Sequence, residues 1–156
     1  MVPDAEVVVA GDGPLRAAME REVAERRVRF SFLGVQTPVQ VRDLMRGASV
    51  LCGPGIVAGS GNTEGLPISF LEAQATGLPV VVSTSGGSDE GVLSEETGFL
   101  HRPGDETAIA EHLIALLTDP VRREAFGAAG RAHMLEHFDL RRQTAALETI
   151  YDDLRG

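Results

Sequence analysis

The residue pattern best suited to chemistry in this chain is a glycine-rich segment, residues 53–65, that precedes a helix signal. The segment reads GPGIVAGSGNTEG, with five glycines in thirteen residues, and runs almost directly into Pro67. Glycine lets a backbone approach a ligand closely and adopt positive φ at no steric cost. The N–H groups at a helix N-terminus attract anions, above all phosphate. The segment therefore predicts a phosphate-binding turn at the start of a helix.

Two carboxylates flank this turn, eight residues apart: Glu64 before it and Glu72 in the expected helix. At ~1.5 Å of rise per residue, Glu72 lies about 8 Å along the axis from Pro67, and its side chain leans back toward the helix start. A carboxylate is a bidentate acceptor, which suits the vicinal diol of a ribose beside a diphosphate. Glu64 would then lie nearer to the group that follows the diphosphate. The alternatives are that Glu72 is a solvated helix residue and that Glu64 caps the helix.

Cations are missing from the same region. No Arg or Lys occurs between Gly47 and His101, and all 14 basic residues of the chain are Arg. The central site therefore offers amides and carboxylates, and the charge that neutralises a diphosphate must come from elsewhere.

The elements that position these residues alternate between strand and helix. Short β-branched runs predict strands, and amphipathic stretches with Pro at their first position predict helices. Such alternation is typical of a Rossmann-like parallel sheet flanked by helices, in an α/β fold that binds ligands at the carboxyl ends of its strands. The expected strands are residues 5–11, 28–34, 49–52, 78–84 and 97–101, and the expected ligand loops are 11–14, 34–37, 53–66 and 84–88.

Several of these elements carry further expectations. Residues 5–11 and 78–84 are expected to be buried strands, and residues 67–77 a helix that is apolar on most faces and therefore buried. Thr37 with Gln40 predicts a capping box, and Asp105 and Asp119 predict helix N-caps. Residues 86–88 are either a turn and helix cap or a loop that faces the ligand.

Several short motifs occur in a fixed order along nearly the whole chain. They are GDGP (11–14), FLG (32–34), EGLPISFLEAQATGLPVVVS (64–83), GG with Glu90, TGFLHRPGD (97–105) and FD (138–139). Each motif alone is weak, but the ordered set with its two glutamates is specific. The chain resembles the C-terminal, donor-binding half of retaining GT-B glycosyltransferases, the glycosyltransferase group 1 family.

The resemblance implies a role for each candidate residue. Glu72 would bind the ribose hydroxyls, and Glu64 would lie near the donor sugar as the catalytic residue. The diphosphate or sugar would meet Gly65, Leu66 and Pro67, and the base would pack near Gly34 and Val35. The implied reaction belongs to carbohydrate biosynthesis: transfer of a sugar from a nucleotide diphosphate donor with retention, without metal or cofactor. The acceptor, a glycan, a lipid or a small molecule, would be held by a separate N-terminal domain.

The chain departs from the family at its N-terminus. The family's donor domain opens with a strand and helix whose Arg and Lys contact the diphosphate, and this chain begins downstream of that unit. We therefore expect residues 1–156 to form one N-terminally truncated donor-binding domain, without an acceptor domain and inactive alone. In the family's sheet the absent strand lies between residues 7–9 and 49–52. We expect these two strands to pair directly or another chain to fill the gap, so self-association through the incomplete sheet is an expected partnership.

Composition excludes other classes of protein. A formal charge of −9, no Trp and one Tyr disfavour nucleic-acid binding. A single cysteine, no leader and no long apolar run favour a cytoplasmic protein, or one peripheral to a membrane when complete. Cys52 is expected to be a buried hydrophobe. His133 and His137 lie four residues apart but lack an evident third ligand. GDGP lacks the third glycine of a dinucleotide fingerprint, which disfavours a dehydrogenase.

Two other functions remain open: a non-catalytic binding or oligomerisation module of the same fold, and a nucleotide-sugar epimerase. The spacing of the two glutamates with EGLP favours the transferase. The nucleotide base, the sugar and the acceptor are not determined by the sequence.

Overall fold

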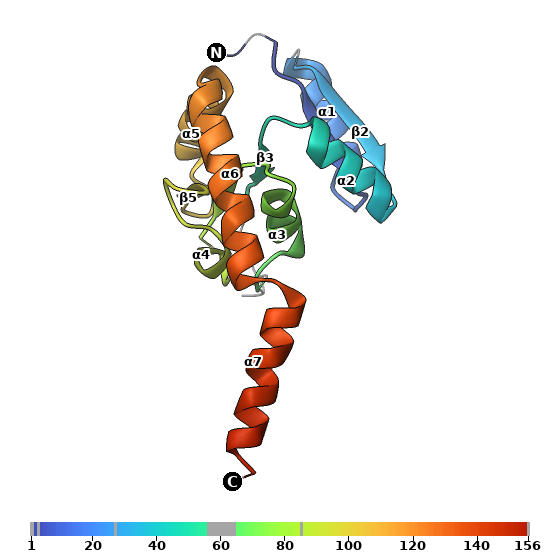
Figure 1. Cartoon of the computed structure of the whole chain (residues 1–156). Coiled ribbons are helices and arrows are strands. Elements are labelled where there is room, and N and C mark those ends of the chain that lie inside the picture. The colour runs from blue at the N-terminus through green and yellow to red at the C-terminus, as the bar shows by residue number, and fades with distance from the viewer. Residues whose placement is uncertain (1, 3, 27, 56–64, 85, 156) are drawn as a thin grey trace. The chain divides into compact units, whose positions relative to one another are not determined.

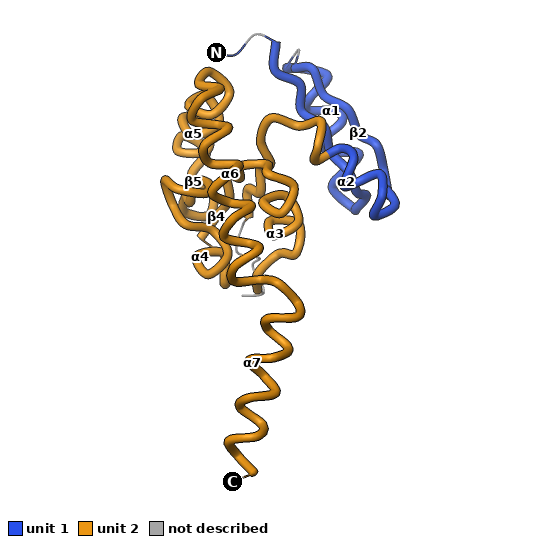
Figure 2. Tube along the Cα trace, in the orientation of Figure 1, with its two compact units in different colours: residues 1–44 blue, residues 45–156 orange. Residues whose placement is uncertain are grey.

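The computed structural model describes residues 2, 4–26, 28–55, 65–84 and 86–155 of the chain. These residues form two compact units, Met1–Leu44 and Met45–Gly156 (Figure 2), which we describe one at a time. Strands and helices alternate along the chain as the sequence predicts (Figure 1). The elements are β1 (Val7–Ala10), α1 (Arg16–Arg26), β2 (Phe30–Gly34), α2 (Pro38–Gly47), β3 (Leu51–Gly53), α3 (Ile68–Ala75), β4 (Val80–Ser83), α4 (Ser88–Gly91), β5 (Gly98–His101), α5 (Glu106–Thr118), α6 (Pro120–His137) and α7 (Leu140–Asp153).

In the first unit, β1 and β2 form a two-stranded parallel sheet, with Val7 opposite Phe30. Helix α1 connects the two strands along the chain. The sequence predicts a buried strand at residues 5–11. This is wrong about burial, because Val7 and Val8 are 43% and 47% exposed. A two-stranded sheet has too few packing neighbours to cover both of its strands. In this unit a run of β-branched residues therefore predicts a strand but does not predict its burial.

A capping box starts α2, as predicted. The backbone N–H of Thr37 donates to Oε1 of Gln40 at 2.9 Å, and the N–H of Gln40 donates to Oγ1 of Thr37 at 3.4 Å. Pro38 fills the first helical position, where its missing N–H costs nothing. The capping box and Pro38 therefore define where the loop after β2 ends and α2 begins.

The second unit carries a three-stranded parallel sheet in the order β3-β4-β5. All four residues of β4 are buried, which confirms the prediction of a buried strand at residues 78–84. Val81 and Phe99 of the sheet pack with Leu116 of α5 and Phe126 of α6 to form a buried cluster. Side chains at the N-caps begin the covering helices: Asp105 accepts from the N–H of Ala108, and Asp119 accepts from the N–H of Arg122.

The expectation of direct pairing between the strands around residues 7–9 and 49–52 is wrong. Among the described strands, β1 pairs with β2 alone and β3 pairs with β4 alone, because the two units form separate sheets. Filling of either edge by another chain is not tested by a single chain and stays a prediction.

Two further expectations about burial are corrected. Cys52 is exposed, since it lies on the outer strand of its sheet. The helix expected at residues 67–77 is not buried on most faces: Ile68 is 71% exposed, and only Phe70, Ala73 and Gln74 of α3 are buried. Short helices that cover one face of a sheet leave the opposite face to water.

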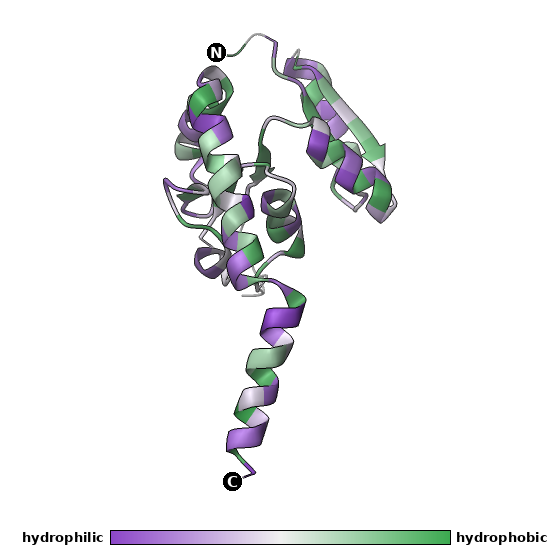
Figure 3. Ribbon diagram, viewed as in Figure 1, coloured by the Kyte–Doolittle hydropathy of each residue, from purple (hydrophilic) through white to green (hydrophobic). Residues whose placement is uncertain are grey.

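The described helices include none that is both long and apolar enough to cross a membrane. Figure 3 shows hydrophilic and hydrophobic residues interleaved along α7, all of whose residues are exposed.

Candidate functional site

The predicted phosphate-binding turn lies where α3 begins. Pro67 is the N-cap residue, with φ −63° and ψ 123°, and its own side chain makes no capping hydrogen bond. The carbonyl of Pro67 accepts the N–H of Phe70 at 3.0 Å, and the first turn holds no acidic side chain. The start of α3 therefore combines the positive end of a helix dipole with a neutral, exposed surface, which is the arrangement that favours an anion.

Glu72 lies on the exposed face of α3, one turn after Ile68, while Phe70 and Ala73 turn into the core. In a helix, side chains four residues apart stack on one face and lean toward the N-terminus. The carboxylate of Glu72 therefore shares a surface with the start of the helix. That this surface binds a ribose beside a diphosphate stays a prediction.

Gly65 and Leu66 are held against a second segment, the start of α4. The N–H of Gly87 donates to the carbonyl oxygen of Gly65 at 3.2 Å. Gly87 is also the N-cap residue of α4. The sequence left open whether residues 86–88 are a turn and helix cap or a loop that faces the donor sugar. The structure shows the cap, and shows in addition that this cap contacts the predicted binding turn.

Glu64, the predicted catalytic residue, lies outside the described residues. Its immediate neighbour Gly65 is described and exposed. The structure therefore describes Gly65, Leu66, Pro67 and Glu72 of the predicted site in the second unit, and Gly34 and Val35 in the first.

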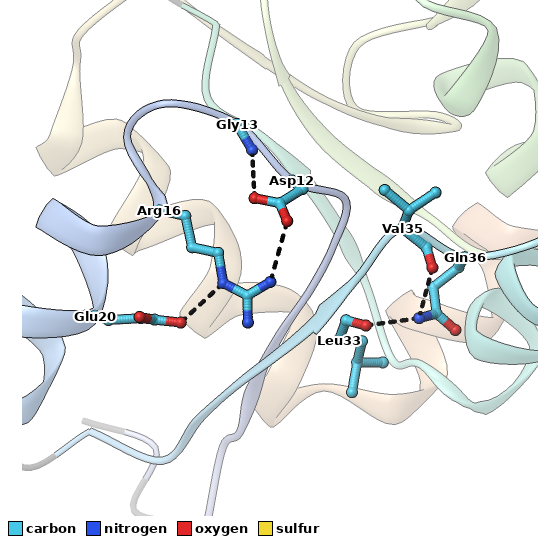
Figure 4. A network of polar contacts seen from close by, with 7 residues as sticks. All are labelled: Asp12, Gly13, Arg16, Glu20, Leu33, Val35 and Gln36. Carbon is cyan, nitrogen blue, oxygen red and sulfur yellow. Dashed lines mark hydrogen bonds and ion pairs between the residues drawn. The ribbon is translucent and has the colours of Figure 1, made fainter.

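The segment after β2 has the open backbone that the sequence predicts for a ligand loop. Gly34 has φ +68°, a conformation that side chains rarely adopt, and Val35 is 82% exposed. The side-chain amide of Gln36 folds back and donates to the carbonyl oxygens of Leu33 at 2.7 Å and Val35 at 3.2 Å (Figure 4). These bonds fix the turn and leave the Val35 side chain in solvent.

Arg16 is a residue near this turn that the sequence did not single out. Its guanidinium lies 5.7 Å from the centroid of the Phe32 ring, and Nη1 would be 3.4 Å from a Cβ placed on Gly34. Its Nε donates to Glu20 at 2.8 Å, and Nη1 donates to Asp12 at 3.4 Å (Figure 4). The hydrogen bond with Glu20 raises the pKa of Arg16, so it is charged at every working pH. The spacing of Asp12, Arg16 and Glu20 by four could have revealed this network.

A metal site does not form among the described residues, where no group of three His, Cys, Asp or Glu side chains comes together. The rings of His133 and His137 are neighbours, with centroids 4.7 Å apart and planes tilted by 49°. The expectation that the reaction needs no metal or cofactor stays a prediction.

The chain matches known proteins over almost its whole length. Residues 1–133 match the model of the family described as glycosyl transferases group 1. A GDP-mannose-dependent monoacylated alpha-(1-6)-phosphatidylinositol monomannoside mannosyltransferase from Corynebacterium glutamicum is 38% identical over 133 residues, which are 85% of this chain and 35% of the relative. This chain thus spans about a third of the length of that relative.

Solved structures show the same fold. The sucrose-phosphate synthase of Thermosynechococcus elongatus superposes with a TM-score of 0.83 at 26% identity, over 97% of this chain and 39% of that one. The Anabaena protein HepE in complex with UDP superposes with a TM-score of 0.84 at 21% identity, over 96% and 42%. The predicted fold class, parallel sheets flanked by helices as in one half of a GT-B glycosyltransferase, is confirmed.

Proposed function

The chain belongs to the glycosyl transferases group 1 family, and from this premise we propose that it binds the nucleotide-sugar donor of a glycosyltransferase. The observation that carries the proposal is the start of α3, where the exposed residues Ile68 and Ser69 of the first turn share a face with Glu72 and the described residues supply no capping side chain. A helix end suits a diphosphate and a carboxylate suits a ribose diol. Both lie in the segment that joins Gly65 to Glu72.

In the proposed complex, the backbone of Gly65, Leu66 and Pro67 meets the diphosphate, and Glu72 accepts hydrogen bonds from the ribose hydroxyls. As a separate proposal, which rests on the family resemblance, the base contacts Gly34 and Val35 of the first unit, whose turn is open and exposed. The name of the HepE structure, a complex with UDP, supports a nucleotide ligand for this fold.

The proposed reaction is retaining transfer of the sugar to a glycan, lipid or small-molecule acceptor, with Glu64 next to the donor sugar and no metal. The acceptor would be held by a domain outside this chain. The relative named for a phosphatidylinositol monomannoside supports a lipid acceptor, which a protein in the cytoplasm would meet at the membrane surface.

The donor is either a GDP-sugar or a UDP-sugar in this proposal, because one similar protein is named for GDP-mannose and another was solved with UDP. Calorimetric titration of the chain with UDP-, GDP- and ADP-sugars distinguishes them. We expect saturable binding of one class. Glu72→Ala should weaken it about tenfold or more, because a hydrogen bond to a charged group is lost, whereas Glu111→Ala, an exposed glutamate on α5, should leave it unchanged.

Other outcomes would favour other functions. If no nucleotide sugar binds, the proposed donor site is wrong, and a non-catalytic module of the same fold becomes the better description. If the longer protein converts a nucleotide sugar without an acceptor, it is an epimerase.

We also propose that the chain associates with a second copy through an open strand edge. Among the described strands β1 has a neighbour on one side only, and it exposes Val7 and Val8. Analytical ultracentrifugation should show a dimer that Val8→Pro removes, because proline blocks edge pairing. A monomer at all concentrations would contradict this.

A further inference from the structure

We infer that Gln74 and Gly91 are positioning residues, which fix the direction of the Leu66 N–H group that would meet the diphosphate. The inference rests on the proposed function, since it concerns the same turn. It is carried by a chain of contacts that runs from the buried side of α3 through α4 to the turn.

The first contact is made by Gln74, which is fully buried in α3. Its side-chain Nε2 donates to the carbonyl oxygen of Gly91 at 2.7 Å, seventeen residues further along the chain. A buried amide is costly unless it is hydrogen-bonded. This bond therefore ties α4 to α3 at a defined distance, which a purely apolar contact would not fix.

The second contact depends on the missing side chain of Gly91. A Cβ at this position would lie 2.9 Å from Cδ1 of Leu66 and 3.0 Å from Cδ2 of Leu71. A Cβ this close would force the ends of the two leucine side chains to move, because they occupy the space next to Gly91. Glycine at position 91 thus lets α4 pack directly on the residue that precedes Pro67.

The third contact reaches the backbone of the turn. With α4 held in place, the N–H of Gly87 donates to the carbonyl oxygen of Gly65 at 3.2 Å. A Cβ on Gly87 would also lie 3.6 Å from Cβ of Leu66, which is ordinary van der Waals contact. The carbonyl of Gly65 is therefore directed at α4.

The direction of the Leu66 N–H follows from the geometry of the peptide bond. The carbonyl of Gly65 and the N–H of Leu66 belong to one planar peptide unit, and the described backbone contains no cis peptide bond. In a trans peptide the two groups point in opposite directions. Because the carbonyl faces α4, the N–H of Leu66 faces away from α4. The contacts of Gln74 and Gly91 thus orient a donor that neither residue touches.

Two variants test this inference on the whole chain. Gln74→Met keeps the volume of the side chain and removes its hydrogen bond to Gly91. Gly91→Ala crowds the side chains of Leu66 and Leu71 and so disturbs the packing of α4 on Leu66. The matched control is Phe126→Leu, a change in the buried cluster of the same unit that leaves these contacts intact. Thermal unfolding of each variant shows that it folds and how much stability it has lost.

The first measurement uses no nucleotide. Hydrogen exchange of the Gly87 amide reports its bond to Gly65, and the NMR shift of the Leu66 amide reports the orientation of the peptide. We expect faster exchange at Gly87 and a shifted Leu66 signal in both variants but not in Phe126→Leu. An unchanged Gly87 amide in Gln74→Met would overturn the inference, whether or not the chain binds nucleotides.

The second measurement compares GDP with GMP and UDP with UMP, because only the diphosphates would reach the turn fully. Loss of one hydrogen bond that orients the donor should weaken diphosphate binding about three- to tenfold. Binding of the monophosphate should change less than about twofold, because the monophosphate does not depend on the Leu66 N–H. Equal weakening of both would mean that Gln74 has only a structural role. If the unaltered chain binds none of the four, the proposed function fails, and the exchange measurement still decides about the contacts.

Discussion

Gly127 of α6 lies against the carbonyl group of Gly77, the glycine that ends α3 and leads into β4. A Cβ on Gly127 would overlap the carbonyl oxygen of Gly77, and it would lie 3.7 Å from Cδ of Pro79. Gly77 itself has φ +81°, the left-handed conformation that glycine supplies after a helix. The backbones of α6 and of the turn after α3 are therefore in direct contact, and this contact holds the C-terminal end of α3 in place.

This contact predicts that Gly127→Ala destabilises the chain. The atom in the way belongs to the backbone, so rotation of a side chain cannot relieve the overlap. We expect a loss of about 3 kcal/mol in the free energy of unfolding, at the upper end of the usual range for overpacking. Urea unfolding followed by circular dichroism measures it.

The control is Gly47→Ala, since nothing lies within 4 Å of a Cβ there and its φ is not in the left-handed region. The removal of glycine's freedom in the unfolded state should leave stability unchanged or raise it by about 0.4–1 kcal/mol. Equal effects of the two variants would contradict the packing of α6 on the turn.

The N-cap of α5 predicts a smaller, local loss of stability. Oδ1 of Asp105 accepts the N–H of Ala108 at 3.0 Å. Asp105→Ala should cost about 1 kcal/mol, because the N–H loses its partner, whereas Asp105→Asn should cost almost nothing. The shift in Tm of the two variants distinguishes them. A large loss for Asn would mean that charge, and not the hydrogen bond, stabilises the helix start.

The proposed role of Glu72 predicts selectivity for ribose over deoxyribose. The unaltered chain should bind GDP or UDP, whichever is its nucleotide, about tenfold or more tightly than the 2′-deoxy form, because a hydrogen bond to a charged group is worth about 1.5–3 kcal/mol. In Glu72→Ala the two forms should bind equally. If the variant still discriminates between them, another group reads the hydroxyls. Because Glu72 is exposed, Tm should stay constant.

Cys52 predicts a pH dependence of chemical reactivity. The residue is exposed, but the chain around it removes enough water to raise the pKa of the thiol. Since the thiolate is the reactive form, alkylation by iodoacetamide should rise with a midpoint above that of an ordinary thiol. Unfolding in urea should move the midpoint to lower pH, and Cys52→Ser should remove the label. The same midpoint in both states would contradict the local burial.

The sequence predicted best where short-range rules decide. Thr37 and Gln40 formed the expected capping box, and Asp105 and Asp119 cap the helices assigned to them. The order of strands and helices also followed from the sequence, because the periodic patterns are only a few residues long. The family membership followed from the order of the motifs along the chain.

Burial and long-range contacts were decided only in the tertiary structure. The valine run of β1 and that of β4 look alike in sequence, yet β1 is largely exposed and β4 is buried, because β4 has a strand on each side and helices over it. In the same way, no spacing in the sequence links Gln74 to Gly91, or Gly127 to Gly77. Local patterns specify which element a segment forms, whereas its neighbours in space decide how much water it loses and which backbone groups it fixes.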